Sequence, residues 1–158
     1  MKLIYLFCLL YLGVIANIFA QELLFGSVVR VIDGDTVELK VESLLQRIRL
    51  SEIDAPETNQ FWGFESREAL ETKLLGKSVR VVVSDVDRYG RTIGTIFIGE
   101  VSINELMVLE GHAWVYREYS DDQNLIDLEN SARAGNKGLW TKENPLPPWQ
   151  WRRERRSQ

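Results

Sequence analysis

Residues 24–53, LFGSVVRVIDGDTVELKVESLLQRIRLSEI, decide the fold that this sequence predicts. The stretch contains three runs rich in aliphatic and β-branched residues, at 24–31, 36–41 and 46–53. The second run alternates apolar and polar residues, which is typical of a strand with one buried face. Asp-Gly-Asp at 33–35 supplies a turn between the first two runs. We therefore predict three consecutive strands.

The rest of the chain continues with helices and strands. Apolar residues at roughly helical spacing predict a helix over 59–75, and two further strands follow at 78–84 and 92–98. Two more helices are expected over 104–110 and 124–134. Five short strands with a helix after the third favour an α+β fold that is mainly β. We expect a five-stranded Greek-key barrel of the oligonucleotide-binding type with three α-helices.

The first 20 residues are typical of a secretion signal. One Lys precedes an apolar run over 3–15, and the segment ends in Ala20. This order predicts a signal peptide that is cleaved on export, and the run is short for a bilayer span of about 20 residues. An uncleaved membrane anchor and a buried strand are the alternatives. Cleavage would remove Cys8, the only cysteine, and leave a secreted or periplasmic protein without a membrane attachment.

We expect one domain over 21–151 and a basic tail over 152–158. The length of 158 residues suits a single domain. The prolines predict extended backbone up to Pro148, and the run at 147–151 is expected to pack on the domain as a strap. The tail contains four Arg against one Glu. It either contacts nucleic acid non-specifically or forms a solvated end.

The overall charge is acidic, with 19 Lys and Arg against 23 Asp and Glu, for a net charge of −4. This balance argues against a protein that coats DNA through a basic surface. It does not exclude a nucleic-acid enzyme, which needs only a local positive groove. Part of the acidic excess comes from Asp33, Asp35, Asp54 and Glu57, and a cation bound by such carboxylates would offset their charge.

Three clusters of polar residues carry the functional signal. In the first, Asp33 and Asp35 flank a glycine before a strand, and two carboxylates can bind a hard cation. The spacing excludes an EF-hand loop. Asp-Gly pairs are also common turn residues, so this cluster taken alone favours an ordinary turn.

The second cluster combines arginines and carboxylates. Alternation puts Arg47 and Arg49 on one face of a strand, where a guanidinium can bind phosphate through two hydrogen bonds. Asp54 and Glu57 follow, on either side of a proline that fixes the turn. A salt-bridged strand edge is the alternative interpretation.

The third cluster is DRYGR at 87–91, between the fourth and fifth strands. Arginine and tyrosine side chains in a hairpin suit contacts to phosphates and bases. An ordinary polar hairpin is the alternative when this cluster is taken alone.

In order, DGDT at 33–36, RIRL at 47–50, IDAPE at 53–57 and DRYGR at 87–91 resemble the motifs of the staphylococcal nuclease family. The resemblance continues through 103–106, 111–116, 132–133 and 138–140, and covers roughly 25–151. It implies the barrel described above and hydrolysis of phosphodiester bonds in DNA and RNA without sugar specificity. It also implies cleavage that leaves 3′-phosphate ends.

The resemblance further implies a role for each site residue. Asp35 and Asp54 would bind Ca²⁺ through their carboxylates and Ala55 through its main-chain carbonyl. Glu57 would act as general base, or would orient the attacking water. Arg49 and Arg91 would stabilise the transition state.

Five other residues receive different expectations. Arg88 and Tyr89 would line the nucleotide pocket, and Asp33 would lie near the metal. Arg117 stands where the family has a substrate-contacting tyrosine, so no role is assigned to it. His112 is expected to be a packing or capping residue.

The sequence thus predicts a secreted, calcium-dependent nuclease that acts as a monomer. Single strands are the expected preferred substrate, because unstacked bases can reach aromatic side chains. The alternative is a non-catalytic nucleic-acid-binding module of the same fold. The presence of all the acidic and arginine residues argues against that alternative.

Overall fold

The structure is a computed structural model that describes residues 22–157. The expected signal peptide, 1–20, lies outside the described residues. Among the residues that are described, no helix is both long and apolar enough to cross a membrane.

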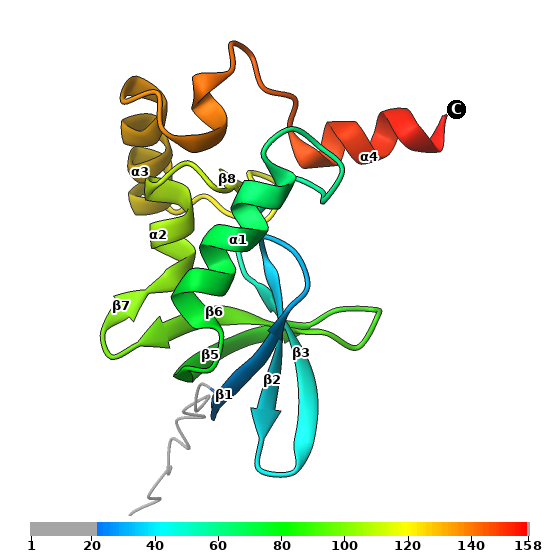
Figure 1. Cartoon of the computed structure of the whole chain (residues 1–158), viewed down its shortest axis with the longest axis vertical. Helices are drawn as coiled ribbons and strands as arrows, with labels where there is room; N and C mark the ends of the chain where they lie inside the picture. Colours follow the sequence, from blue (N-terminus) through cyan, green and yellow to red (C-terminus); the bar gives the residue numbers. More distant parts are fainter. Residues whose placement is uncertain (1–21, 158) are drawn as a thin grey trace, which may run out of the picture.

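Five long strands close into a barrel (Figure 1). They are β1 (Leu23–Val31), β2 (Thr36–Val41), β3 (Leu44–Leu50), β5 (Ser78–Val86) and β6 (Thr92–Ile98). Neighbouring strands run in the order β3-β2-β1-β5-β6, and a parallel pairing of β3 with β6 closes the barrel. The short β7 (Val101–Ser102) extends β6 beyond the barrel. The five-stranded barrel predicted from the sequence is confirmed.

The third predicted strand, 46–53, is wrong at its C-terminal end. β3 stops at Leu50, because Glu52 adopts a left-handed backbone with φ of 65° and reverses the chain. Ile53 and Asp54 then form a separate strand, β4 (Ile53–Asp54), which pairs with β8 (Trp114–Val115). This break matters for the site, since it turns Asp54 off the barrel sheet.

Four α-helices accompany the barrel in the described residues, one more than the three expected. They are α1 (Gly63–Leu74), α2 (Ile103–Leu109), α3 (Gln123–Ala134) and α4 (Pro148–Arg156), with a 3₁₀ turn, η1 (Gly138–Thr141), before the last. The expected basic tail at 152–158 therefore begins inside a helix. Pro148 explains the start of α4, because a proline in the first turn lacks only an N–H that the helix does not use.

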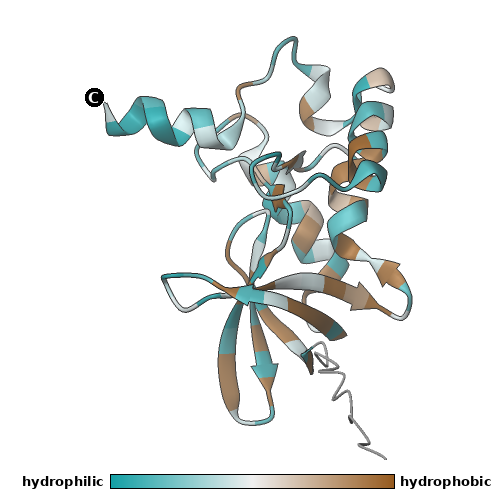
Figure 2. Ribbon diagram, turned by 180° about the vertical axis from the view of Figure 1, so that it is seen from behind, coloured by the Kyte–Doolittle hydropathy of each residue, from teal (hydrophilic) through white to brown (hydrophobic). Residues whose placement is uncertain are grey.

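The main core lies between the barrel interior and the helices that cover it. Its largest fully buried side chains come from both layers, and include Leu39, Ile48, Leu70, Ile96 and Met107. Hydrophobic residues concentrate on the barrel strands and on α2 and α3, whereas α4 is hydrophilic over most of its length (Figure 2). α4 thus owes its position to a small number of polar and aromatic contacts.

Gly34 allows the turn between β1 and β2 to lie against α1. A Cβ atom at this position would overlap the Ser66 hydroxyl and approach the Ala55 side chain. A glycine is needed where backbone approaches another segment this closely. The turn that carries Asp33 and Asp35 is thereby held next to the 54–57 segment.

Candidate functional site

A pocket of about 1150 Å³, here called the barrel pocket, opens beside β3 and reaches α4. Its lining comes from the β1–β2 turn, the 49–57 segment, the β5–β6 hairpin, the 116–119 loop and α4. All eight residues predicted for the site line it: Asp35, Arg49, Asp54, Ala55, Glu57, Arg88, Tyr89 and Arg91. The structure therefore brings the three sequence clusters together.

Arg49 is fixed at the floor of the barrel pocket between two aspartates. Its Nη1 lies 3.1 Å from Asp35 Oδ2, and its Nη2 lies 3.0 Å from Asp54 Oδ1. A further hydrogen bond runs from Nη1 to the carbonyl of Ile53. These acceptors hold the guanidinium in one orientation, with 14% of its side chain exposed.

The carboxylates around Arg49 are buried and close to one another. Asp35 accepts hydrogen bonds from the Ala55 amide and the Thr36 hydroxyl, and its own amide donates to Asp33. Burial and the Asp35 charge raise the pKa of Asp33 to about 7. Burial also raises the pKa of Asp54 to about 6, against the opposing effect of its hydrogen bonds to Arg152. Burial is therefore the main cause of both raised pKa values.

Arg91 enters the barrel pocket from the β5–β6 hairpin. Its Nε lies 2.7 Å from Asp87 Oδ2, and the Asp87 carboxylate also accepts from the Arg91 and Tyr89 amides. Burial opposes but does not outweigh these hydrogen bonds, which lower the pKa of Asp87. Next to it, the Arg88 guanidinium lies over the exposed Tyr89 ring, 4.9 Å from its centre. The hairpin thus presents an aromatic ring and two cations to the pocket.

Arg152 is the site residue that the sequence analysis missed. It donates two hydrogen bonds to Asp54, of 3.1 and 2.7 Å, and one of 2.8 Å to Glu57 Oε1. Burial opposes but does not cancel these contacts, which raise the pKa of Arg152. Arg152 lies in the expected tail, and nothing in the local sequence links it to Asp54 or Glu57, which precede it by 98 and 95 positions.

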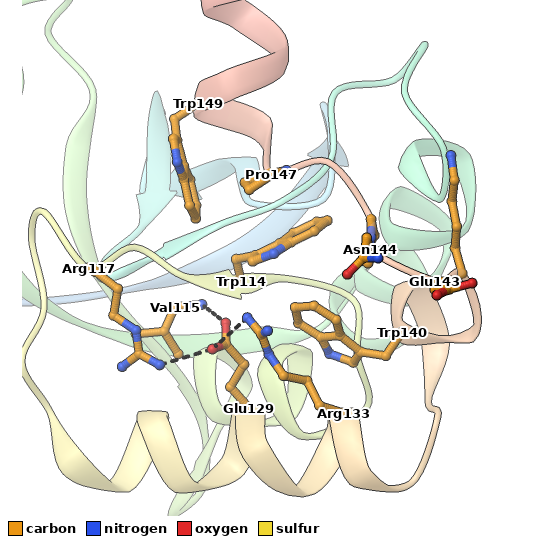
Figure 3. Close-up of a pocket in the computed structure, with 12 residues that line it drawn as sticks. Trp114, Val115, Arg117, Glu129, Arg133, Trp140, Glu143, Asn144, Pro147 and Trp149 are labelled. Carbon is orange, nitrogen blue, oxygen red and sulfur yellow. Dashed lines mark hydrogen bonds and ion pairs between the residues drawn. The ribbon is translucent and has the colours of Figure 1, made fainter.

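A second pocket contains Arg117, the position that departs from the family pattern (Figure 3). The buried Glu129 of α3 accepts from the Val115 amide and forms ion pairs with Arg117 and Arg133. Arg117 does not line the barrel pocket. Its guanidinium therefore has a structural partner away from the candidate site.

The remaining expectations concern packing residues. His112 accepts a hydrogen bond from Trp62 Nε1 at its Nδ1, so it packs between α1 and α2 as expected. Trp114 and Trp140 are buried against each other at 5.1 Å between ring centres. Trp149 stacks on Tyr116, with ring centres 5.3 Å apart and planes within 4°. The expected packing of the 147–151 segment on the domain is thus observed, although the segment becomes helical at Pro148.

The donor chemistry of the barrel pocket suits a hard cation. Carboxylates of Asp35 and Asp54 and the main-chain carbonyl of Ala55 offer oxygen only, which calcium prefers. Asp35 and Asp54 lie on either side of Arg49, and a bound cation would offset the negative charge that they bring together. Within residues 22–157, however, no three Asp, Glu, His or Cys side chains converge as a preformed metal cage. Part of any coordination would have to come from water and substrate.

A barrel of the oligonucleotide-binding type with clustered carboxylates and guanidinium groups defines a class of proteins suited to phosphate-ester chemistry on nucleic acids. The family model described as "Staphylococcal nuclease homologue" matches residues 47–142 of this chain. An uncharacterized endonuclease of Escherichia coli is 41% identical over 147 residues, which cover 90% of this chain and 96% of that protein.

Two further relatives agree. A micrococcal nuclease of Shigella flexneri is 40% identical over 81% of this chain and 80% of its own length. A probable staphylococcal-like nuclease of Oryza sativa, CAN2, is 44% identical over 70% of this chain and 30% of its own, longer sequence. The chain belongs to the staphylococcal nuclease family.

Proposed function

We propose that this protein is a secreted, calcium-dependent nuclease that hydrolyses phosphodiester bonds in DNA and RNA and prefers single strands. Family membership supports phosphodiester hydrolysis by an endonuclease. The observation that carries the proposal is the convergence of all eight predicted residues, from separate segments, on the barrel pocket.

The arginines would stabilise the transition state by position and charge. Phosphodiester hydrolysis adds negative charge to the non-bridging phosphate oxygens, and fixed donors aimed at them lower the barrier. Arg49 is such a donor, since two carboxylates hold it in place. Arg91 faces the same pocket from the hairpin. Neither donates a proton, because arginine stays charged at physiological pH.

Glu57 is the best general base among the pocket carboxylates. Its side chain is 38% exposed, so water can reach it, whereas Asp54 is 1% exposed. Pro56 and the hydrogen bond from the Glu57 amide to Gln60 fix the backbone that carries it. In this structure Arg152 holds its Oε1, which leaves Oε2 for a water molecule.

Calcium, when bound, would be held by Asp35, Asp54 and the carbonyl of Ala55, and supplies Lewis-acid activation of a phosphate oxygen. The protein's own part is to keep these oxygens buried and close together. Arg49 limits their mutual repulsion in the absence of the ion.

The substrate preference follows from the hairpin. Tyr89 is exposed, so its ring can stack on a base that is free of a duplex. The contacts proposed here address phosphates and base faces, which DNA and RNA share. We therefore expect both DNA and RNA to be cleaved. We also propose that the protein acts as a monomer.

A nuclease assay on single-stranded DNA and RNA tests the proposal. We expect cleavage with Ca²⁺ and none in excess EGTA, and Glu57→Gln should lower turnover roughly 10²–10⁴-fold. Glu68→Gln is the matched control, since Glu68 is an exposed glutamate on α1 away from the pocket. Undiminished cleavage in EGTA would remove the metal from the proposal. Binding without cleavage would favour the alternative of a non-catalytic module.

Export is tested separately. Signal cleavage predicts an extracellular or periplasmic protein whose first residue is Gln21, as read by N-terminal sequencing. An intact N-terminus in the membrane fraction would instead indicate an uncleaved anchor.

A further inference from the structure

α4 presents a basic face to the barrel pocket. Spacings of three and four residues place Trp149, Arg152, Arg153 and Arg156 on one side of the helix. These four residues line the pocket, and the other side chains of α4 do not. α4 also lies beyond residue 142, where the match to the family model ends.

Two contacts fix α4 at the rim of the pocket. Arg152 binds Asp54 and Glu57 through three hydrogen bonds. One turn earlier, Trp149 stacks on Tyr116. α4 is therefore held in place before substrate arrives, and a site that is already ordered loses less entropy on binding.

Arg153 and Arg156 are the arginines of this face that no carboxylate neutralises. Both are exposed, and neither forms an ion pair with any residue in the described part of the chain. Arg152, by contrast, is committed to two carboxylates. These two guanidinium groups thus form an anion-binding surface that is continuous with the pocket.

We propose that Arg153 and Arg156 form a subsite that binds backbone phosphates of the single-stranded substrate next to the phosphate being cleaved. The proposal rests on the nuclease function proposed above. A polynucleotide is the occupant that fits, because the basic face opens into the pocket where one phosphate of the same strand would react. Phosphate contacts position a strand without reading its sequence, and they serve DNA and RNA alike.

The experiment compares three single variants, Arg153→Gln, Arg156→Gln and Arg155→Gln. All three remove one positive charge from an exposed position on α4. Arg155 is the matched control, because it lies over Trp151, 5.4 Å from the ring centre, and does not line the pocket. Each variant is assayed on a dinucleotide and on DNA and RNA strands of about 12 nucleotides, a length that spans several phosphates.

We expect Arg153→Gln and Arg156→Gln each to lower the ratio of oligonucleotide to dinucleotide kcat/KM about 3-fold or more, mainly through KM. The dependence of log kcat/KM on log salt should weaken by about 0.7 for each phosphate that the variant no longer binds. Arg155→Gln should keep the wild-type ratio and slope. Equal effects of all three variants would show a response to net charge alone and would overturn the subsite, as would wild-type ratios for Arg153→Gln and Arg156→Gln.

A binding measurement separates this proposal from the proposed function. The anisotropy of a fluorescent oligonucleotide, measured in EDTA at low salt, should rank the variants in the same order without any cleavage. A wild-type protein that cleaves neither substrate but shows this ranking would contradict the nuclease and support the subsite.

Sedimentation with anionic phospholipid vesicles tests whether Arg153 and Arg156 bind a membrane surface instead of a polynucleotide. Vesicle binding that depends on Arg153 and Arg156, with oligonucleotide binding unchanged, would overturn the proposal.

Discussion

Arg49 reaches Asp54 from the barrel, five residues away in sequence, whereas Arg152 reaches the same carboxylate from α4, 98 residues away. Arg49 is 14% exposed and is enclosed by two carboxylates and two carbonyls. Arg152 is 35% exposed and sits on a helix that adds little to the core. The difference suggests that the barrel builds the site and that α4 completes its rim. The predictions below test this division.

Replacing Arg49 should have the largest effect on stability. Arg49→Met would leave the buried Asp35 without its ion-pair partner and would leave Asp54 with Arg152 alone. Removing one partner of a buried ion pair costs about 3–5 kcal/mol of unfolding free energy. Urea unfolding in EDTA measures it. Arg47→Met, on the same strand but 60% exposed, is the control and should change stability by less than about 0.5 kcal/mol. Similar unfolding midpoints for the two variants would contradict the assigned role of Arg49.

Calcium should stabilise the folded protein by a smaller amount. An ion that binds only the folded state at 100 times its Kd adds about 2.7 kcal/mol of unfolding free energy. Asp35→Asn should remove most of that gain, since it deletes a proposed ligand on the barrel side. Thermal unfolding with and without Ca²⁺ measures the effect, and Mg²⁺ at the same concentration controls for ionic strength. A gain that survives Asp35→Asn would place the ion elsewhere.

Replacing Arg152 should cost less than replacing Arg49. Hydrogen bonds to charged groups contribute about 1.5–3 kcal/mol when buried, and partial exposure reduces this to about 1 kcal/mol here. We expect Arg152→Met to lower the urea midpoint slightly and to raise KM for oligonucleotides, because α4 loses its main anchor. A decrease in stability as large as that of Arg49→Met would show that α4 stabilises the fold as much as the barrel contacts do. It would contradict the division between a site built by the barrel and a rim completed by α4.

The same distinction explains what the sequence could predict. Strand alternation is a local signal, so the barrel could be predicted. The eight expected site residues came from the resemblance of DGDT, RIRL, IDAPE and DRYGR to the family motifs, and the structure places all eight around one pocket. The break at Glu52 was missed, because a left-handed backbone at a glutamate has no propensity signal. Arg152 was missed for a different reason. Its pairing with Asp54 depends on how the whole chain packs, and its surroundings look like an ordinary basic tail.

The smallest effect concerns how the barrel side holds the segment that carries Asp54 and Glu57. That segment leads to Trp62, whose indole N–H donates to His112 Nδ1 at 3.2 Å.

Burial and the Lys73 charge lower the pKa of His112 from its ordinary 6.5, with Glu110 and Glu65 opposing the shift. The neutral ring is therefore favoured in the folded state, and the unfolded chain takes up the proton at higher pH. Stability from this group is full above pH 6.5 and falls as the pH drops toward the lowered pKa. Urea unfolding from about pH 8 to about pH 5.5 should show this decrease in the wild type and a smaller one in His112→Gln. Equal decreases in both proteins would mean that protonation of His112 does not contribute to the pH dependence of stability.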